Sequence, residues 1–243
     1  MEKELIIKQE GDLTRLTLNR PETRNALNAT LVEELISAVD EAVCEGSKLL
    51  VLSGNGKSFC AGFDLSDIKA ISEAELIRRL IRIEILLQKI HHAPVAILAM
   101  AHGAAFGAGA DLVVACGCRI ASPNTRFRMP GLGFGVVLGT RRLANTVGSG
   151  AAREVLEGLK TIEAPHALKI NLLTAIVDKS GWETVVDDEL HTAMILSPSA
   201  KATMLREIIE DTRDRDLAVL VRSLTAPGLK ARIAEFVQGE KGN

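Results

Sequence analysis

Two glycine-bearing turns are the parts of this sequence whose residue types could do chemistry. The first is Phe59–Leu65 (FCAGFDL) and the second is His102–Leu112 (HGAAFGAGADL), and each joins an apolar, strand-like run to a helical one. Glycine permits a tight turn and leaves backbone N–H groups uncovered, and a helix start adds the positive end of its dipole. Two such donors aimed at one oxygen would form an oxyanion hole. The alternative is that these glycines only make tight connections between elements.

Other common catalytic motifs are incomplete. The segment Gly54–Ser58 ends like a phosphate-binding loop, but Val51 stands where that motif needs glycine. Neither Gly107–Leu112 nor Gly131–Val136 completes the GxGxxG dinucleotide pattern. The sequence contains no HExxH, CxxC or GxSxG motif, and its five histidines are dispersed except for His91-His92. These motifs therefore give no support for an ATP, dinucleotide or metal site, or for a serine nucleophile.

The elements that must position the two turns follow from hydrophobic periodicity. Residues 4–9 and 13–19 flank Glu10-Gly-Asp12 and predict a β-hairpin. Asn28 can cap a helix that ends near Gly46, and the apolar run 49–52 then predicts a strand buried on both faces. Further along, the pattern predicts helices over 72–90 and 108–115, and strands over 95–100, 119–121 and 125–128. This alternation is typical of an α/β layer fold.

From residue 143 onward the pattern is mainly helical. The clearest helices are predicted over 185–194, 199–213 and 228–237, with a short strand over 174–177. We therefore divide the chain into a core over 1–190, which would hold the site, and a helical region over 191–243. A helical tail of this length is expected to cover the site and to mediate oligomerisation.

The composition limits the kinds of partner that this protein can bind. Lys plus Arg total 29 against 31 for Asp plus Glu, so the chain lacks the basic excess of a nucleic-acid-binding protein. The stretch 93–110 is uncharged, but Pro94 and three glycines interrupt it, and we expect no membrane span. Four cysteines are too few for a disulfide framework, and the first residues do not resemble a signal peptide. We expect a cytoplasmic protein.

Four segments in register resemble the crotonase (enoyl-CoA hydratase/isomerase) superfamily. They are 18–28 (LNRPETRNALN), 52–65 (LSGNGKSFCAGFDL), 94–111 (PVAILAMAHGAAFGAGAD) and 139–143 (GTRRL), and the match extends over about residues 5–158. The resemblance implies an α/β fold with a crotonase-type ββα spiral core and a helical C-terminal region, assembled as a homotrimer or a dimer of trimers. It also implies an acyl-CoA substrate, with coenzyme A as part of that substrate and no separate cofactor.

The same resemblance assigns roles to residues of both turns. In the family, two backbone N–H groups polarise the thioester carbonyl, and here they would belong to Phe63 and Ala108. Ala108 stands where the family usually has glycine. Its backbone N–H remains available as a donor if its φ is negative. Arg24 matches a basic position that contacts CoA phosphates. The backbone of Ala61 and Leu65 would lie near the adenine and the pantetheine.

Asp111 is the candidate catalytic residue. Hydratases of the family use two glutamates, and the matching positions here hold Asp111 and Gly131. Asp111 opens a predicted helix in an uncharged segment, which suits a buried base, although a helix dipole alone can also retain a carboxylate there. We expect enolate chemistry with a single carboxylate, so that isomerisation, decarboxylation or weak hydration is favoured over fast hydration. The alternative is a catalytically impaired acyl-CoA-binding protein that keeps the fold.

Overall fold

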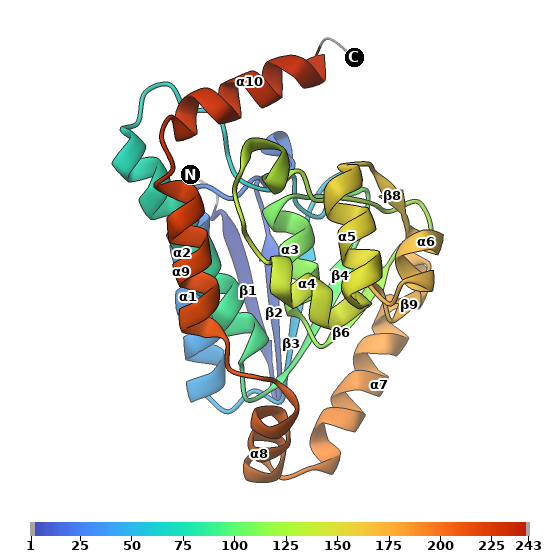
Figure 1. Cartoon of the computed structure of the whole chain (residues 1–243). Coiled ribbons are helices and arrows are strands. Elements are labelled where there is room, and N and C mark those ends of the chain that lie inside the picture. The colour runs from blue at the N-terminus through green and yellow to red at the C-terminus, as the bar shows by residue number, and fades with distance from the viewer. Residues whose placement is uncertain (1–2, 242–243) are drawn as a thin grey trace.

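The computed structural model describes residues 3–241 as two sheets surrounded by helices (Figure 1). In the larger sheet β1 and β2 form an antiparallel hairpin, and every other neighbouring pair is parallel. Its order is β1 (Leu5–Glu10), β2 (Leu13–Leu18), β3 (Leu49–Gly54), β4 (Ala96–Ala101), β6 (Cys118–Ala121) and β9 (Ala175–Ile176). The smaller sheet contains β5 (Ala104–Phe106), β7 (Arg126–Arg128) and β8 (Ile162–Glu163).

The predicted hairpin and the first two helices are confirmed. Gly11, with a φ of +63°, turns the chain between β1 and β2. The Asn28 side chain accepts a hydrogen bond from the Leu31 N–H at 2.8 Å and caps α1 (Ala29–Cys44). Ser72 caps α2 (Glu73–His91) in the same way. Sequence, capping and strand order therefore agree on the expected α/β alternation.

Helices cover both faces of the larger sheet. Successive side chains of β3 alternate between the faces, so Leu50 packs under α1, α2 and α3 (Ala108–Ala115), whereas Leu49 packs against α7 (Trp182–Ile195). At the end of the molecule away from α7, α10 crosses over the sheet (Figure 1). The remaining helices are α4 (Thr140–Val147), α5 (Ser149–Gly158), α6 (Ala164–Lys169), α8 (Pro198–Ile208), α9 (Arg213–Leu224) and α10 (Leu229–Lys241), with 3-10 turns η1 (Pro21–Thr23), η2 (Gly131–Phe134) and η3 (Lys179–Gly181).

Three observations differ from the predicted elements. The helix predicted over 199–213 is wrong in its length, because Ile209 adopts extended backbone angles and a separate helix, α9, begins at Arg213. The strand β5 was not predicted, since three residues are too few to show an alternating pattern. The predicted division between residues 190 and 191 falls inside α7. Among residues 3–241, no helix has both the length and the apolar character needed to cross a membrane.

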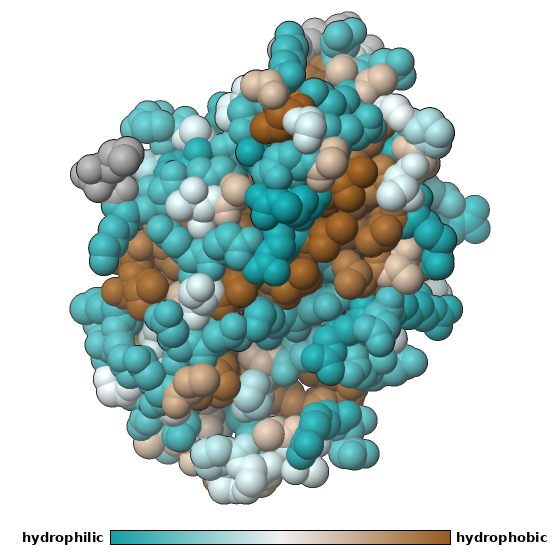
Figure 2. Space-filling model, turned by 90° about the vertical axis from the view of Figure 1, so that its left-hand side faces the viewer, coloured by the Kyte–Doolittle hydropathy of each residue, from teal (hydrophilic) through white to brown (hydrophobic). Residues whose placement is uncertain are grey.

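The helix α8 buries none of its residues within the chain. Ile208 on α8 is 69% exposed, and Ile195 at the end of α7 is 68% exposed. On another side of the molecule, an oblique apolar strip interrupts a largely hydrophilic surface (Figure 2). Contiguous exposed apolar groups usually mark a surface that contacts another protein, a membrane or a ligand.

Candidate active site

The two glycine-bearing turns lie side by side. The Cys60 N–H donates to the Ala104 carbonyl at 3.1 Å, and the Phe106 N–H donates to the Cys60 carbonyl at 2.9 Å, so the first turn runs along β5. Gly62 has a φ of +92°, and a Cβ there would lie 2.6 Å from the Phe106 oxygen. A Cβ on Gly109 would lie 2.4 Å from the Cys60 oxygen. Both positions therefore require glycine for close approach of the two backbones.

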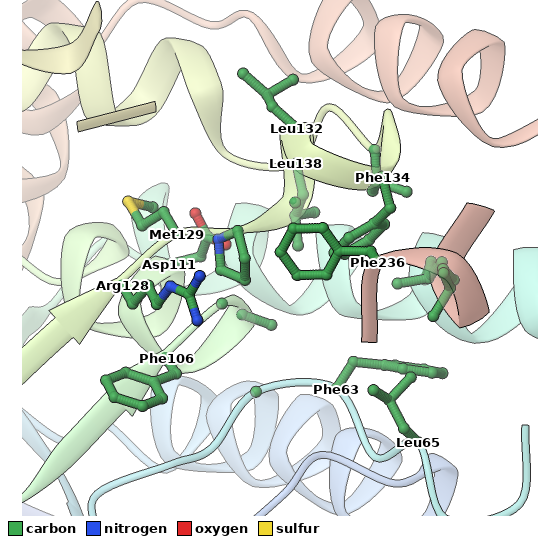
Figure 3. Close-up of a pocket in the computed structure, with 18 of the residues that line it drawn as sticks. Phe63, Leu65, Phe106, Asp111, Arg128, Met129, Leu132, Phe134, Leu138 and Phe236 are labelled. Carbon is green, nitrogen blue, oxygen red and sulfur yellow. The ribbon is translucent and has the colours of Figure 1, made fainter. Parts of the chain in front are cut away.

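An apolar cavity of about 210 Å³ opens between these turns, η2 and α10 (Figure 3). One end of the cavity holds Asp111, Arg128, Met129 and Phe106, and the other end holds the remaining aromatic side chains (Figure 3). Four of the six phenylalanines of this aromatic-poor chain line the cavity. Its apolar lining from the turns, α2, η2 and α10 includes Phe63, Leu65, Leu80, Phe106, Leu132, Phe134, Val136, Leu138, Ile233, Phe236 and Val237.

Two backbone N–H groups of the cavity wall are free. Among the hydrogen bonds of residues 3–241, neither the Phe63 N–H nor the Ala108 N–H has an acceptor. Ala108 is the first residue of α3, where the helix itself offers no acceptor. The two turns approach closely at this point, because a Cβ on Gly62 would lie 3.4 Å from the Ala108 nitrogen. Donors arranged in this way can stabilise a developing negative charge on an oxygen between them.

Asp111 lies in the first turn of α3 and is buried. Burial raises the pKa of its carboxyl from 3.8 to about 8; the nearby positive charge of Arg142 opposes this shift, and the negative charge of Glu84 adds to it. Among the described residues, no hydrogen-bond partner reaches its Oδ1 atom. A carboxyl that titrates close to neutral pH can both take up and deliver a proton, which is the requirement for general acid–base catalysis.

Replacing Gly139 by alanine should displace the Asp111 carboxyl. Gly139 has a φ of +64°, and a Cβ there would lie 2.1 Å from Oδ1 of Asp111. We expect turnover of an acyl-CoA substrate to fall by at least about tenfold, since small misplacements of a reacting group are costly. The matched control is Gly11→Ala, which has a φ of +63° but open space around it. That control should lower thermal stability and keep turnover, whereas wild-type turnover in Gly139→Ala would contradict the packing argument.

A buried ion pair lies behind Asp111 and was not predicted. Arg142 Nη2 on α4 donates to Glu84 Oε1 on α2 at 2.7 Å, and the two side chains are 5% and 2% exposed. Gln88 Nε2 donates to the same Glu84 oxygen at 3.0 Å. Burial raises the pKa of Glu84, and Arg142 opposes that shift. The helical period could have indicated this residue, because Glu84 follows Leu80 by one turn on the buried face of α2.

The other predicted residues, except Arg24, line the same cavity. Ala61 and Leu65 line it, and the Ala61 N–H donates to the Arg24 carbonyl at 2.9 Å. Arg24 itself is exposed and is not among the lining residues. Gly131 lines the cavity at the start of η2, so this position supplies no carboxylate. Within residues 3–241, no group of three or more His, Cys, Asp or Glu side chains could hold a metal ion.

The family can be decided by comparison with known proteins. The family model described as enoyl-CoA hydratase/isomerase matches residues 8–225. This chain belongs to the enoyl-CoA hydratase/isomerase family. The match spans most of the chain, including both turns, η2 and α4, and it confirms the crotonase resemblance of the four sequence segments.

Individual relatives agree with that assignment. The chain is 34% identical over 187 residues to a short-chain-enoyl-CoA hydratase from Clostridium acetobutylicum, covering 72% of this chain and 69% of the relative. It is 36% identical over 184 residues to the probable enoyl-CoA hydratase echA6 from Mycobacterium tuberculosis, covering 73% of each. A crystal structure of a candidate enoyl-CoA hydratase/isomerase from Bordetella parapertussis superposes with a TM-score of 0.96 at 43% identity, covering 97% of this chain and 99% of that one.

Proposed function

We propose that this enoyl-CoA hydratase/isomerase family enzyme acts on an acyl-CoA thioester through an enolate, with Asp111 as its one proton-transferring carboxyl. The observation that carries the proposal is that Asp111 shares one cavity with the two free N–H groups of Phe63 and Ala108. No other Asp or Glu of the described chain lines that cavity. The apolar walls suit the hydrocarbon part of an acyl group.

The reaction follows from the charges that the cavity can stabilise. Ionised Asp111 takes a proton from the carbon next to the thioester carbonyl, and the C–H electron pair moves into an enolate. The negative charge gathers on the carbonyl oxygen, where the N–H groups of Phe63 and Ala108 would hold it. Delivery of a proton from Asp111 to a different carbon completes an isomerisation. A largely apolar cavity strengthens these interactions because little water competes for the donors.

Proton exchange in heavy water tests this proposal. The wild-type enzyme is incubated with a panel of enoyl-CoA and 3-oxoacyl-CoA thioesters, and deuterium at the carbon next to the thioester is followed by mass spectrometry and NMR. We expect deuterium uptake that far exceeds the uncatalysed rate. Binding without exchange across the whole panel would instead favour a catalytically impaired acyl-CoA-binding protein, a function that the lack of a carboxylate at Gly131 also favours.

Introducing a carboxylate at Gly131 should raise hydration activity. A Cβ at this position would lie 3.0 Å from the Val136 oxygen, so the loop must move by a few tenths of an ångström to admit it. We expect Gly131→Glu to hydrate crotonyl-CoA about tenfold faster than the wild type, because a second general acid–base group then faces the cavity. Gly131→Gln is the matched control of the same size. An equal gain in both variants would show that charge at this position is irrelevant.

The CoA part of the substrate and the assembly complete the proposal. In this proposal the backbone of Ala61 and Leu65, which line the cavity, contacts the adenine and the pantetheine, and the exposed Arg24 contacts a CoA phosphate. Calorimetry with acetyl-CoA and crotonyl-CoA measures this binding, and its absence at millimolar concentration would end the proposal. The exposed apolar face of α7 and α8 supports a homotrimer or a dimer of trimers. Light scattering that gives a monomer mass would contradict it.

A further inference from the structure

A second cavity lies behind the acyl cavity. It has a volume of about 330 Å³, is open to solvent, and is lined by polar side chains that include Glu84, Arg141 and Asp216. Thr140 is the residue of interest, because it lines both this rear cavity and the acyl cavity. Its neighbour Gly139 touches Asp111 and also lines the rear cavity. The start of α4 is therefore the wall between the two cavities.

Four buried polar atoms around this wall have no hydrogen-bond partner among the described residues. They are Asp111 Oδ1, Thr140 Oγ1, Glu84 Oε2 and Arg142 Nη1. Buried polar atoms in proteins are nearly always hydrogen-bonded to protein or to water, and these four have no protein partner, so the wall between the cavities is suited to bridging water molecules. They come from α2, α3 and α4, and α3 packs against both of the other helices.

The bonding of Glu84 leaves one of its oxygens available. Arg142 Nη2 and Gln88 Nε2 both donate to Oε1, which fixes the carboxylate and leaves Oε2 free. Gln88 is held in turn by a hydrogen bond to the Arg213 carbonyl at 3.0 Å. At the rear cavity, Arg141 Nε donates to Asp216 Oδ1 at 2.7 Å. Glu84 is thus a positioned proton acceptor between the apolar site and a charged, solvent-open recess.

A proton on Asp111 needs such a route. Once an acyl group fills the front cavity, its hydrocarbon part separates the carboxyl from solvent on that side. An apolar filling conducts no protons, so exchange with solvent would have to await product release. A path through the opposite wall avoids that limit.

We propose that Thr140 and Glu84, with Glu84 positioned by Arg142, form a proton path between Asp111 and the rear cavity. Protonated Asp111 passes its proton through a bridging water to the Thr140 oxygen, while the Thr140 hydroxyl passes its own proton through a second water to Glu84 Oε2. Glu84 then passes that proton to water in the rear cavity, and each residue recovers its starting state when the hydroxyl turns back. Other titratable groups nearby are His91 on α2, whose pKa is lowered to about 4 by burial and by the charge of Arg142, and Arg128 on β7, which lines the acyl cavity. The proposal rests on the proposed role of Asp111 as the proton-transferring group.

Isomerisation of a 3-enoyl-CoA in heavy water tests the path. The measured quantity is the ratio of deuterium to protium delivered to the γ-carbon of the product during single turnovers. In the wild type we expect mainly deuterium, because Asp111 exchanges its proton while the enolate exists. In Thr140→Val and in Glu84→Gln the ratio should fall about tenfold, the effect expected from one missing hydrogen-bonded link, whatever the change in turnover.

Two further variants separate the path from a structural role. Thr140→Ser keeps the hydroxyl and should retain the wild-type ratio. Thr146→Val alters another threonine of α4, whose hydroxyl donates to the Arg142 carbonyl at 2.9 Å, and should also retain it. A wild-type ratio in Thr140→Val, or pure protium transfer in the wild type, would overturn the path. If the wild type moves no proton on any substrate, the proposed function has failed instead.

Discussion

Replacing Asp111 by asparagine should reduce proton exchange next to the thioester by about 10²- to 10⁴-fold, the usual contribution of a positioned general base. Asparagine has nearly the same shape, so the cavity and the two free N–H groups should keep their geometry. Binding of crotonyl-CoA, measured by calorimetry, should therefore stay within about threefold of the wild type, a small free-energy change. Unchanged exchange in this variant would place the base elsewhere in the cavity.

The pH dependence follows from the raised pKa of Asp111. Because the carboxyl must be ionised to accept a proton, wild-type exchange should rise with pH and level off above about pH 8. Stability should change in the opposite direction. The folded state holds this proton up to about pH 8, whereas the unfolded chain releases it near its ordinary pKa of 3.8. The stabilising contribution is complete below about pH 4 and is lost as the pH rises to 8.

The wild type loses this stabilisation as the pH rises, whereas Asp111→Asn does not. The pH dependence of stability therefore shows whether the variant is correctly folded. Asparagine resembles the protonated acid and does not ionise, so the variant should match or exceed the wild-type thermal midpoint at neutral pH. The advantage of the variant should widen from pH 4 to pH 8 and then stay constant. Thermal unfolding followed across this range measures it. An inactive variant that is also less stable than the wild type at pH 8 would point to a structural role for the carboxylate.

Replacing Ala108 by proline should cost about 10²- to 10³-fold in proton exchange, because proline removes one of the two donors for the enolate oxygen. Ala108 is the first residue of α3, and proline is well tolerated at that position since the missing N–H has no acceptor in the helix. The variant should therefore fold with a thermal midpoint close to that of the wild type. The loss should appear mainly in the chemical step.

Ser149→Pro is the matched control for this variant. Ser149 is the first residue of α5, lies outside the cavity, and follows Gly148, which has a positive φ as Gly107 does before Ala108. This control should keep exchange at the wild-type rate. Equal losses of proton exchange in both variants would show that proline itself causes the effect. Wild-type exchange in Ala108→Pro would show that the Ala108 N–H has no part in the mechanism.

The fold was predictable from the sequence because its main signals are local. Asn28 and Ser72 are cap residues beside periodic apolar runs, and the central parallel strands β3 and β4 are short uncharged segments. The glycine turns were predictable for a similar reason, since glycine at positions 62 and 109 indicates that two backbones approach closely there. Local rules of this kind also located Asp111 at a helix start.

The residues behind Asp111 were not predictable in the same way. Glu84 and Arg142 are 58 positions apart, and although the helical period places Glu84 on the buried face of α2, no local pattern identifies its partner. Only the tertiary contact between Glu84 on α2 and Arg142 on α4 makes them a buried pair. The contribution of Ile233 and Phe236 to the cavity likewise depends on where α10 crosses, which no local pattern encodes. Long-range packing therefore determines the part of the site that tunes the carboxyl.

The position of α10 has a consequence for the order in which this site forms during protein synthesis. The turns, α3 and η2 leave the ribosome first, and α10 follows the whole of them by about a hundred residues, so a nascent chain can fold its core before that wall exists. At that stage the acyl cavity lacks one of its apolar walls, and water can enter it beside the Phe63 and Ala108 N–H groups. The cavity is complete only when Ile233, Phe236 and Val237 dock.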